Sequence, residues 1–234
     1  MKAIIVAGGH GSRLHPLTLH THKTLLPLCG RPIIDYVLAA IRNAGIADIT
    51  IIGNKFIDKI KAHVGEDMKY VLEKEPKGVA AALELARSGN EGCPLLIWFS
   101  DNISNIDLSK YVADFKGGAV LLSREVEKPS EFGIAVFDKG ELIDIVEKPI
   151  SAPSNIAIGG IYLFDSSFWN KFDLAKNIAN FSISDVTKQY VNQNSVELVT
   201  VGSNTWMDCG TPEGLQIAAQ MIEEGLFTIQ EVGI

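Results

Sequence analysis

Glycines and basic residues gather near the start of the sequence in a pattern that suits a bound polyphosphate. The stretch AGGHGSRLHPLT, residues 7–18, follows the apolar run KAIIV. Its first part supplies residues with little or no side chain: Ala7, Gly8, Gly9 and Gly11. Because glycine has no Cβ, the backbone N–H groups of such a loop can approach an anion closely. Arg13 and, ten residues later, Lys23 would bring full positive charges to the same anion.

Other phosphate-binding loops fit these residues poorly. A dinucleotide fingerprint would need glycine at Leu14 and an acidic residue about 20 positions beyond the strand, where Arg31 and Pro32 stand. A Walker A loop needs Gly-Lys-Ser/Thr, whereas HKT stands at residues 22–24. A plain tight turn is the remaining alternative to an anion-binding loop.

Two aspartates in strand-like surroundings are candidate metal ligands. Asp101 ends the apolar run PLLIWFSDN, and Asp208 lies in TWMD. Mg²⁺ prefers one or two carboxylates together with phosphate oxygens and water. A turn-capping role is the alternative for each aspartate. Four histidines near the glycine loop do not form a recognisable zinc pattern: His10, His15, His20 and His22.

The elements that must position these residues alternate between strands and helices. Up to about residue 126, apolar strand-like runs end in loops and are followed by helical spacing, as in RPIIDYVLAAIRNAG and GVAAALELARSG. Such alternation predicts a mostly parallel sheet covered by helices on both faces. Ligands of these sheets bind beyond the carboxyl ends of the strands, where the glycine loop and Asp101 both fall.

The second half of the sequence has a different pattern. FGIAVFDKGELIDIVEKP predicts a hairpin, and IAIGGIYLFD, VELVTVG and TWMD predict strands. SISDVTKQYVNQN and TPEGLQIAAQMIEEGLF have helical spacing. No low-complexity linker separates the halves, so we expect one domain over residues 1–234, with parts 1–126 and 127–234.

Composition limits the classes of protein and partner. The 234 residues are 47% apolar and 21% charged and carry a net charge of −7, which argues against nucleic acid as a partner. The three cysteines are scattered and form no CxxC: Cys29, Cys93 and Cys209. The start of the sequence offers no signal-peptide core, and no run approaches the roughly 20 apolar residues that cross a bilayer. We therefore expect a cytoplasmic protein with no membrane partner.

Several motifs together resemble one enzyme family. AGGHGSRLHPLT followed by HKTLLPLCGRPIIDY is similar to the signature of sugar-1-phosphate nucleotidyltransferases, GGxGxRLxPLT with a lysine ten residues after the arginine and then LLP. EPKGVAAAL, FSDN, EFGIAVFD, VEKP, NIAIGGIYLFD and WMDCGT resemble later family segments in the same order. The resemblance implies a Rossmann-like α/β fold, with a mostly parallel sheet flanked by helices and a smaller sugar-binding β/α part in residues 127–234.

The resemblance also implies an activity. In this family a sugar-1-phosphate oxygen attacks the α-phosphorus of a nucleoside triphosphate and pyrophosphate leaves, with Mg²⁺ as the cation. The catalytic residues would be Arg13, Lys23, Asp101 and Lys148, and the metal ligands Asp101 and Asp208. The nucleotide would contact Ala7, Gly8, Gly9, Gly11, Arg13, Lys23, Glu73 and Gly78. The sugar would contact Gly133, Glu147, Lys148, Gly160, Tyr162 and Trp206, although Trp206 could equally be a core aromatic.

One position departs from the family pattern and leaves the base open. Thymidylyl- and uridylyltransferases have glutamine five residues before the Gly78 equivalent, where this sequence has Glu73. A carboxylate only accepts hydrogen bonds, which suits the two adjacent N–H donors of guanine. Thr24 also replaces a glutamine usual in the thymidylyl branch. Overall likeness nevertheless favours dTTP or UTP with glucose 1-phosphate; the alternative is guanylyl transfer to a mannose- or heptose-type 1-phosphate.

Two other functions are less well supported by the residues. A nucleotide-sugar-binding regulatory subunit would be expected to lack the arginine, the lysine or the carboxylates, all of which are present. A dinucleotide-dependent oxidoreductase conflicts with Leu14. The sequence also lacks the extra C-terminal helices that build the tetramer of common thymidylyltransferases, so we expect a monomer or homodimer.

Overall fold

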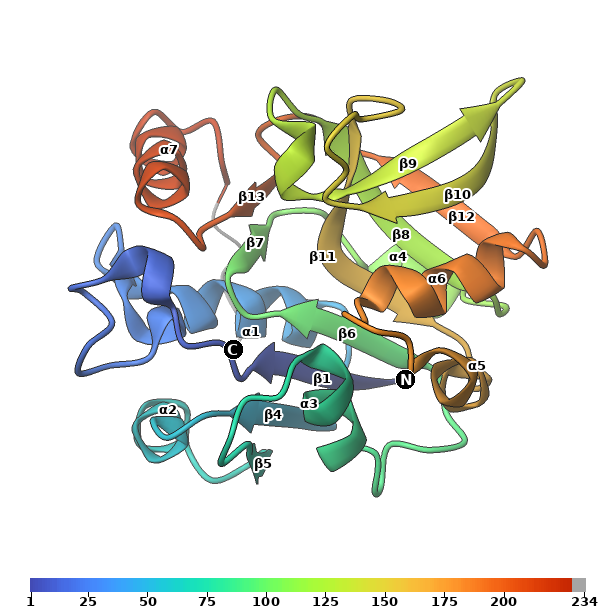
Figure 1. Ribbon diagram of the computed structural model, residues 1–234. Coiled ribbons are helices and arrows are strands. Elements are labelled where there is room, and N and C mark those ends of the chain that lie inside the picture. The colour runs from blue at the N-terminus through green and yellow to red at the C-terminus, as the bar shows by residue number, and fades with distance from the viewer. Residues whose placement is uncertain (229–234) are drawn as a thin grey trace.

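A single large sheet organises the molecule. The computed structural model describes residues 1–228, and within them nine strands form this sheet in the order β10-β9-β11-β6-β1-β4-β5, with β8 and β12 joined to it through β11 (Figure 1). The strands are β1 (Lys2–Ala7), β4 (Ile49–Gly53), β5 (Lys69–Leu72), β6 (Leu95–Phe99), β8 (Ala119–Glu125), β9 (Gly133–Asp138), β10 (Glu141–Glu147), β11 (Ile156–Phe164) and β12 (Val196–Thr200).

The first half of the sheet is parallel. β1 pairs with β4 and β6, and β4 pairs with β5, all in the same direction. The strand β1 is buried along almost its whole length, as expected for a strand covered on both faces. Because the strands are parallel, the segments that follow β1, β4, β5 and β6 all leave the sheet at one edge.

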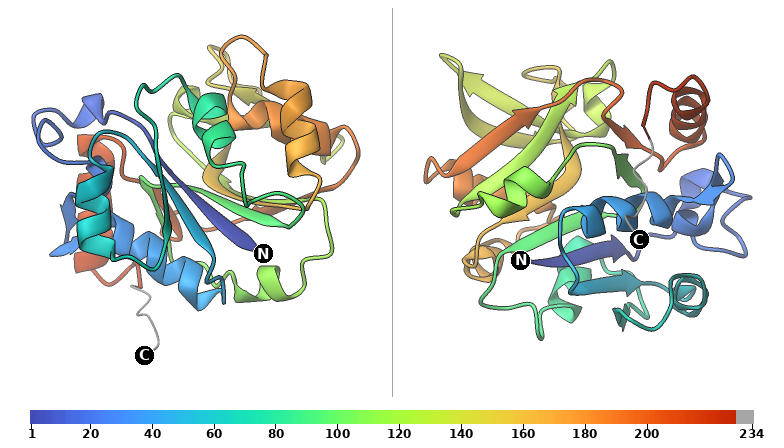
Figure 2. Two further views of the ribbon diagram at one scale, coloured as in Figure 1. Left: turned by 90° about the horizontal axis from the view of Figure 1, so that it is seen from below. Right: turned by 180° about the vertical axis from the view of Figure 1, so that it is seen from behind.

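Helices cover both faces (Figure 2). On one face the core contains residues of α1 (Ile33–Asn43) and α2 (Ile57–Val64), and on the other it contains residues of α3 (Val79–Leu85), α5 (Phe168–Ala175) and α6 (Ile183–Val191). The short helix α4 (Ser109–Ala113) precedes β8. The opposite apolar faces of the strands therefore each have a helical cover, which explains their unbroken apolar sequences.

The second half of the sheet is largely antiparallel. β11 pairs antiparallel with β6, β8 and β9, while β9 and β10 form the predicted hairpin. β12 runs parallel to β8. Because β11 pairs directly with β6, the two halves share one sheet.

Two small sheets complete the fold near the carboxyl edge. β7 (Asn102–Ser104) pairs with β13 (Trp206–Asp208), which aligns Asn102 with Asp208, and β2 (Pro27–Leu28) pairs with β3 (Arg31–Pro32). The helix α7 (Pro212–Glu223) packs with the segment around β2 in a third apolar cluster. Single turns of 3₁₀ helix stand at Ser12–Leu14, Lys23–Leu25 and Pro129–Glu131.

The predicted fold class is confirmed, and within residues 1–228 the structure adds α5 and the short strands β2, β3 and β7 to the predicted elements. Each segment predicted as a strand or helix forms that element. The helix α5, for which the sequence analysis makes no prediction, lies between β11 and α6. Within residues 1–228 no helix is both long and apolar enough to span a membrane.

Candidate active site

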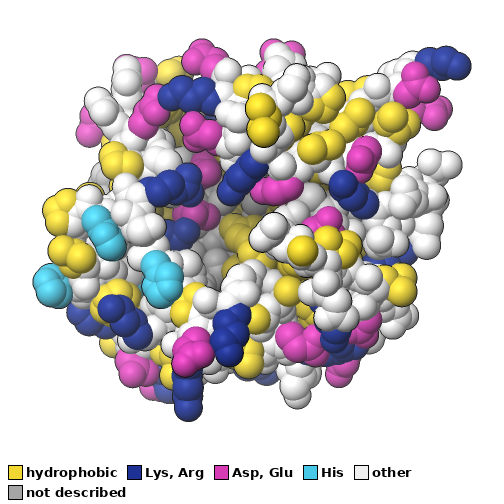
Figure 3. Space-filling view, viewed as in Figure 1, with side chains coloured by type: hydrophobic (Ala, Val, Ile, Leu, Met, Phe, Trp, Pro, Cys, Tyr) yellow, Lys and Arg dark blue, Asp and Glu magenta, His cyan; other side chains and the backbone are white. Residues whose placement is uncertain are grey.

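A cavity of about 480 Å³ opens where the two halves face each other. Figure 3 shows the molecule hollowed at the centre of this face, with acidic and basic side chains around the hollow. The residues that line the cavity come from both halves and include Asp101, Gly133, Glu147, Lys148, Gly160, Tyr162, Trp206 and Asp208. The sequence-predicted sugar and metal residues therefore lie together.

The glycine loop follows β1 at this edge, and side-chain hydrogen bonds hold its backbone. Asn54, which follows β4, donates from Nδ2 to the carbonyl of Gly9 across 3.0 Å. A Cβ on Gly9 would lie 3.5 Å from Lys23 Nζ, so the lysine lies over the loop. Gly11 has φ +65°, a left-handed conformation that favours glycine, and Thr18 donates to its carbonyl across 2.7 Å.

Glu73 lies against this loop. Its side chain is only 3% exposed, and a Cβ on Gly8 would lie 2.0 Å from Oε2. Oε1 accepts a hydrogen bond from the backbone N–H of Lys77 across 3.3 Å. Burial raises the pKa of Glu73, against the lowering effects of the Lys77 N–H and of His10. Gly78, with φ +96°, stands immediately before α3.

The predicted metal ligands converge beside Gly210. A Cβ on this glycine would lie 2.9 Å from each of three charged atoms: Asp101 Oδ2, Asp208 Oδ1 and Arg13 Nη2. Two atoms that lie equally far from one point are at most twice that distance apart, so the carboxylates and the guanidinium form one cluster. The backbone N–H of Gly210 also donates to Asp208 Oδ1 across 2.7 Å.

The pKa values of the two carboxyl groups in this cluster shift in opposite directions. Burial acts to raise the pKa of Asp101, but the Lys23 ammonium that contacts Oδ2 and the hydrogen bonds to this carboxylate hold its pKa below the ordinary value. The pKa of Asp208 is raised by burial and by the charge of Asp101. Lys23 and Arg13 therefore compensate only part of the negative charge of Asp101 and Asp208.

These residues fit a hard divalent cation. Two buried carboxylates whose charges repel each other would be stabilised by a cation between them. Within residues 1–228 no cluster of three or more His, Cys, Asp and Glu side chains could hold a metal by itself. Two carboxylates with the rest of the coordination left to phosphate oxygens and water is the donor set that Mg²⁺ prefers.

Asn102 connects the carboxylate cluster with the sugar side. Its Nδ2 donates to Asp101 Oδ1 across 2.9 Å, and its Oδ1 accepts from Trp206 Nε1 across 2.7 Å and from the backbone N–H of Gly160 across 3.2 Å. A Cβ on Gly160 would meet the Asn102 amide at 2.7 Å. Glycine at this position thus permits the close approach on which the contact depends.

Glu147 and Ser184 make a further polar contact beside the predicted sugar residues. Ser184, at the start of α6, donates from Oγ to Glu147 Oε2 across 2.9 Å. A Cβ on Gly133 would lie 3.0 Å from Ser184 Oγ and 3.2 Å from Glu147 Oε2. Lys148 follows with φ 43°, and its backbone N–H donates to the carbonyl of Phe132. The Glu147 carboxylate and the exposed Lys148 side chain are therefore presented at the cavity from one turn.

The two predicted sugar-side aromatics are mostly buried. Tyr162 is 6% exposed, and burial together with the charge of Glu147 raises the pKa of its hydroxyl. Trp206 is 1% exposed, and its ring packs edge-on to Phe132 with centroids 5.8 Å apart. The Arg124 guanidinium lies 4.9 Å from the Trp206 ring. Trp206 therefore supports the cavity wall more than it offers an open stacking face.

Four residues of the site carry no role in the sequence analysis: Asn102, Ser184, Gly210 and His22. His22 accepts at Nδ1 from the Thr24 N–H across 3.1 Å and is 1% exposed. Asn102 could have been noticed because it directly follows Asp101 at a strand end. Nothing in the sequence shows that Ser184 reaches Glu147, since 36 residues separate them in the chain.

The fold is α/β, and its cavity brings a glycine loop with two basic side chains together with a pair of buried carboxylates. A family model described as nucleotidyl transferase matches residues 2–225. The chain belongs to this nucleotidyl transferase family, and it is an enzyme of the sugar-1-phosphate nucleotidyltransferase kind.

Named relatives and solved structures agree with this assignment. A glucose-1-phosphate thymidylyltransferase of Xanthomonas campestris pv. campestris is 32% identical over 95% of this chain and 80% of its own length. A Sulfolobus acidocaldarius protein named as a mannose-1-phosphate guanyltransferase is 32% identical over 91% of this chain and 60% of its own length. A Bacillus anthracis structure, described as a glucose-1-phosphate thymidylyltransferase in complex with sucrose, is 31% identical with a TM-score of 0.85, and the match covers 94% of each chain.

Proposed function

We propose that this enzyme transfers a thymidylyl or uridylyl group from dTTP or UTP to glucose 1-phosphate and releases pyrophosphate. Asp101 and Asp208 would hold Mg²⁺, which when bound supplies positive charge to the phosphates. Arg13 and Lys23 would neutralise the triphosphate, and Lys148 would bind the sugar phosphate. Residues 1–126 would bind the nucleotide and residues 127–234 the sugar, within one cytoplasmic domain that acts as a monomer or homodimer.

The burial of Glu73 is the observation that supports a pyrimidine base. Thymine and uracil present an N–H donor beside a carbonyl acceptor. A neutral carboxyl group has one O–H donor and one carbonyl acceptor, the same pattern as the glutamine that Glu73 replaces. Burial disfavours the charged form of a carboxyl group, and the pKa of Glu73 is raised chiefly for this reason.

The same residue gives a second candidate function. If Glu73 is ionised when the nucleotide binds, its two oxygens would accept from the N1–H and 2-amino groups of guanine. The Sulfolobus relative, named for guanylyl transfer to mannose 1-phosphate, makes this alternative concrete. The protonation state of one side chain therefore separates the two functions.

Pyrophosphate release from matched substrate pairs tests the proposal. Wild type and Glu73→Gln are compared with dTTP, UTP and GTP, each with glucose 1-phosphate and with mannose 1-phosphate, at Mg²⁺ saturation between pH 5.5 and pH 8.5. We expect dTTP or UTP to be used with glucose 1-phosphate. Glu73→Gln, whose amide presents one donor and one acceptor at all of these pH values, should retain the preference for the pyrimidine nucleotide.

Guanylyl transfer would give the opposite result. GTP would then be the preferred nucleotide, and Glu73→Gln would lower its kcat/KM by roughly 10- to 100-fold, because a mispaired buried polar group costs about 1–3 kcal/mol. Tight nucleotide binding without pyrophosphate release under any pairing would contradict transfer altogether and favour a regulatory subunit.

A further inference from the structure

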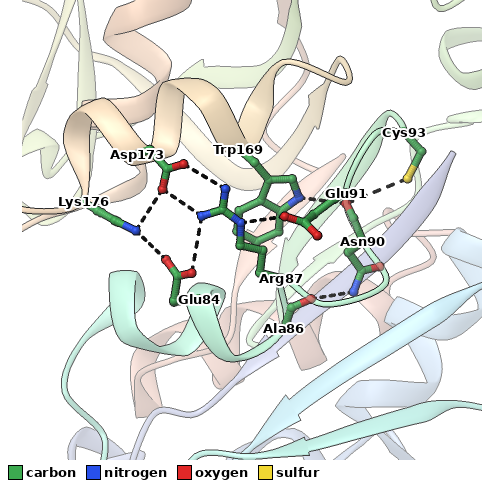
Figure 4. Close-up of polar contacts among 9 residues, drawn as sticks. All are labelled: Glu84, Ala86, Arg87, Asn90, Glu91, Cys93, Trp169, Asp173 and Lys176. Carbon is green, nitrogen blue, oxygen red and sulfur yellow. Dashed lines mark hydrogen bonds and ion pairs between the residues drawn. The ribbon is translucent and has the colours of Figure 1, made fainter.

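Five charged side chains join α3 to α5 on the outside of the molecule (Figure 4). Arg87 donates from Nη1 and Nη2 to the two carboxylate oxygens of Asp173, each across 2.8 Å, and from Nε to Glu91 across 2.9 Å. Lys176 lies 2.9 Å from both Glu84 and Asp173. We call Glu84, Arg87, Glu91, Asp173 and Lys176 the Arg87 cluster.

Aromatic and backbone contacts reinforce the same junction. The Arg87 guanidinium lies 5.3 Å from the Trp169 ring centroid, within the range of a cation–π contact. Trp169 Nε1 donates to the carbonyl of Asn90 across 2.8 Å, and Asn90 in turn donates to the carbonyl of Ala86 across 2.7 Å (Figure 4). The loop after α3 is thus tied to α5 by a buried hydrogen bond as well as by charges.

The two joined elements each lead to a part of the cavity lining, which we call the α3 wall and the α5–α6 wall. Val79, the first residue of α3, lines the cavity and follows the Glu73–Gly78 segment of the proposed base site. On the other side, Phe181 lines the cavity and packs edge-on to Phe172 of α5, with ring centroids 5.6 Å apart. Asp173 is the next residue of α5, so the Arg87–Asp173 pair joins one wall to the other.

Within the described residues, no member of the Arg87 cluster lines the cavity, so the cluster affects substrates only through the position of the walls. An isolated exposed ion pair contributes little to stability. A bidentate arginine–carboxylate contact that belongs to a network, with the guanidinium beside an aromatic ring, holds a defined geometry. We propose that the Arg87 cluster is a clasp that keeps the α3 wall against the α5–α6 wall, and that Arg87 and Asp173 are positioning residues for nucleotidyl transfer.

Steady-state kinetics of a double-mutant cycle test the clasp. In Arg87→Gln and in Asp173→Asn we expect KM for both substrates to rise by roughly three- to tenfold, with kcat within about twofold of wild type, because the walls loosen while the carboxylate cluster is intact. The KM increase in the double variant should be smaller than the product of the two single-variant increases, since both substitutions break the Arg87–Asp173 contact. Lys61→Gln, which breaks the exposed Lys61–Glu66 pair of 2.8 Å on α2, is the matched control and should leave KM unchanged.

Hydrogen exchange provides a second readout that needs no turnover. The inference rests on the proposed function for the cavity as the substrate site, so exchange separates a failure of the clasp from a failure of that assignment. In Arg87→Gln we expect faster exchange in both residues 74–82 and residues 176–183, with unchanged exchange in β1 and α1. Unchanged exchange in these two segments, or KM increases that multiply in the double variant, would overturn the clasp. Faster exchange in both segments with an unchanged KM would instead overturn the assignment of the cavity as the substrate site.

Discussion

Asn102 donates from Nδ2 to Oδ1 of Asp101 across 2.9 Å, and the groups around Asn102 permit only this orientation of its side-chain amide. Trp206 Nε1 and the backbone N–H of Gly160 are donors only, so they must face the Asn102 oxygen. The amide nitrogen is then turned toward Asp101. Because Oδ1 of Asp101 is bound in this way, its Oδ2 is directed at Lys23 and the carboxylate cluster.

Asn102→Asp tests this orientation with nearly unchanged shape. The new carboxylate would place a negative oxygen where Nδ2 now donates to Asp101, which leaves like charges in a buried site. We expect the Mg²⁺ concentration for half-maximal activity to change and kcat to fall by roughly 100-fold, the usual effect of losing one preorganised group. The measurement is pyrophosphate release across a Mg²⁺ titration, with far-UV circular dichroism to confirm the fold. Wild-type kinetics in this variant would show that Asn102 does not orient Asp101.

Replacement of the predicted metal ligands should separate metal binding from folding. In Asp101→Asn and Asp208→Asn we expect loss of most turnover, and removal of the cation from wild type by EDTA should have the same effect. Both variants should bind Mn²⁺, a spectroscopic substitute for Mg²⁺, more weakly than wild type in an electron paramagnetic resonance titration. Asp107→Asn, at an exposed turn where Asp107 accepts from Ser109, is the control. Wild-type Mn²⁺ affinity in either carboxylate variant would exclude that residue from the metal site.

The sequence predicted the fold more completely than the site, for physical reasons. Strands and helices depend on local apolar spacing, which is visible along the chain. The helix α5 carries such a signal in the spacing of Phe168, Phe172 and Ala175, although no helix was predicted there. Predicted site residues from both halves do line one cavity, whereas the contact of Ser184 with Glu147 depends on how α6 packs across β10, which no local pattern encodes.

Gly210→Ala should disturb the carboxylate cluster by volume alone. The added methyl group would lie 2.9 Å from Asp101, Asp208 and Arg13 atoms, closer than a real Cβ contact allows, so at least one of these groups must move. We expect kcat to fall by roughly 10- to 100-fold, since a displaced preorganised group is nearly equivalent to a lost one. Pyrophosphate release and the melting temperature are measured together.

Gly202→Ala is the matched control for this substitution. Its added methyl group would meet only the side chains of Asn204 and Thr205, at 3.2 and 3.7 Å, outside the cluster. If Gly210→Ala were as active as Gly202→Ala, the convergence of charged groups beside Gly210 would have no part in turnover.

We expect His22 to make the stability of the protein depend on pH. Burial, and then the neighbouring Lys23 charge, lower the pKa of His22 from 6.5 to about 4, against the opposite effect of the Ala7 and Gly9 backbones. The Thr24 N–H donates to Nδ1 of His22, so the imidazole in the folded protein is the neutral tautomer with its proton on Nε2. As pH falls below 6.5, His22 becomes protonated in the unfolded chain. In the folded chain it stays neutral until the pH approaches about 4.

The stabilisation from a neutral His22 is therefore complete above pH 6.5 and is lost as pH falls toward 4. Between pH 7 and pH 4.5 this residue should account for about 2–3 kcal/mol of the decrease in the free energy of unfolding. His22→Asn retains an acceptor for the Thr24 N–H and has no titration in this range, so its decrease should be smaller than that of wild type by this amount. Urea unfolding of both proteins at the two pH values measures the difference. Equal decreases in the two proteins would mean that His22 is protonated in the folded state near its ordinary pKa.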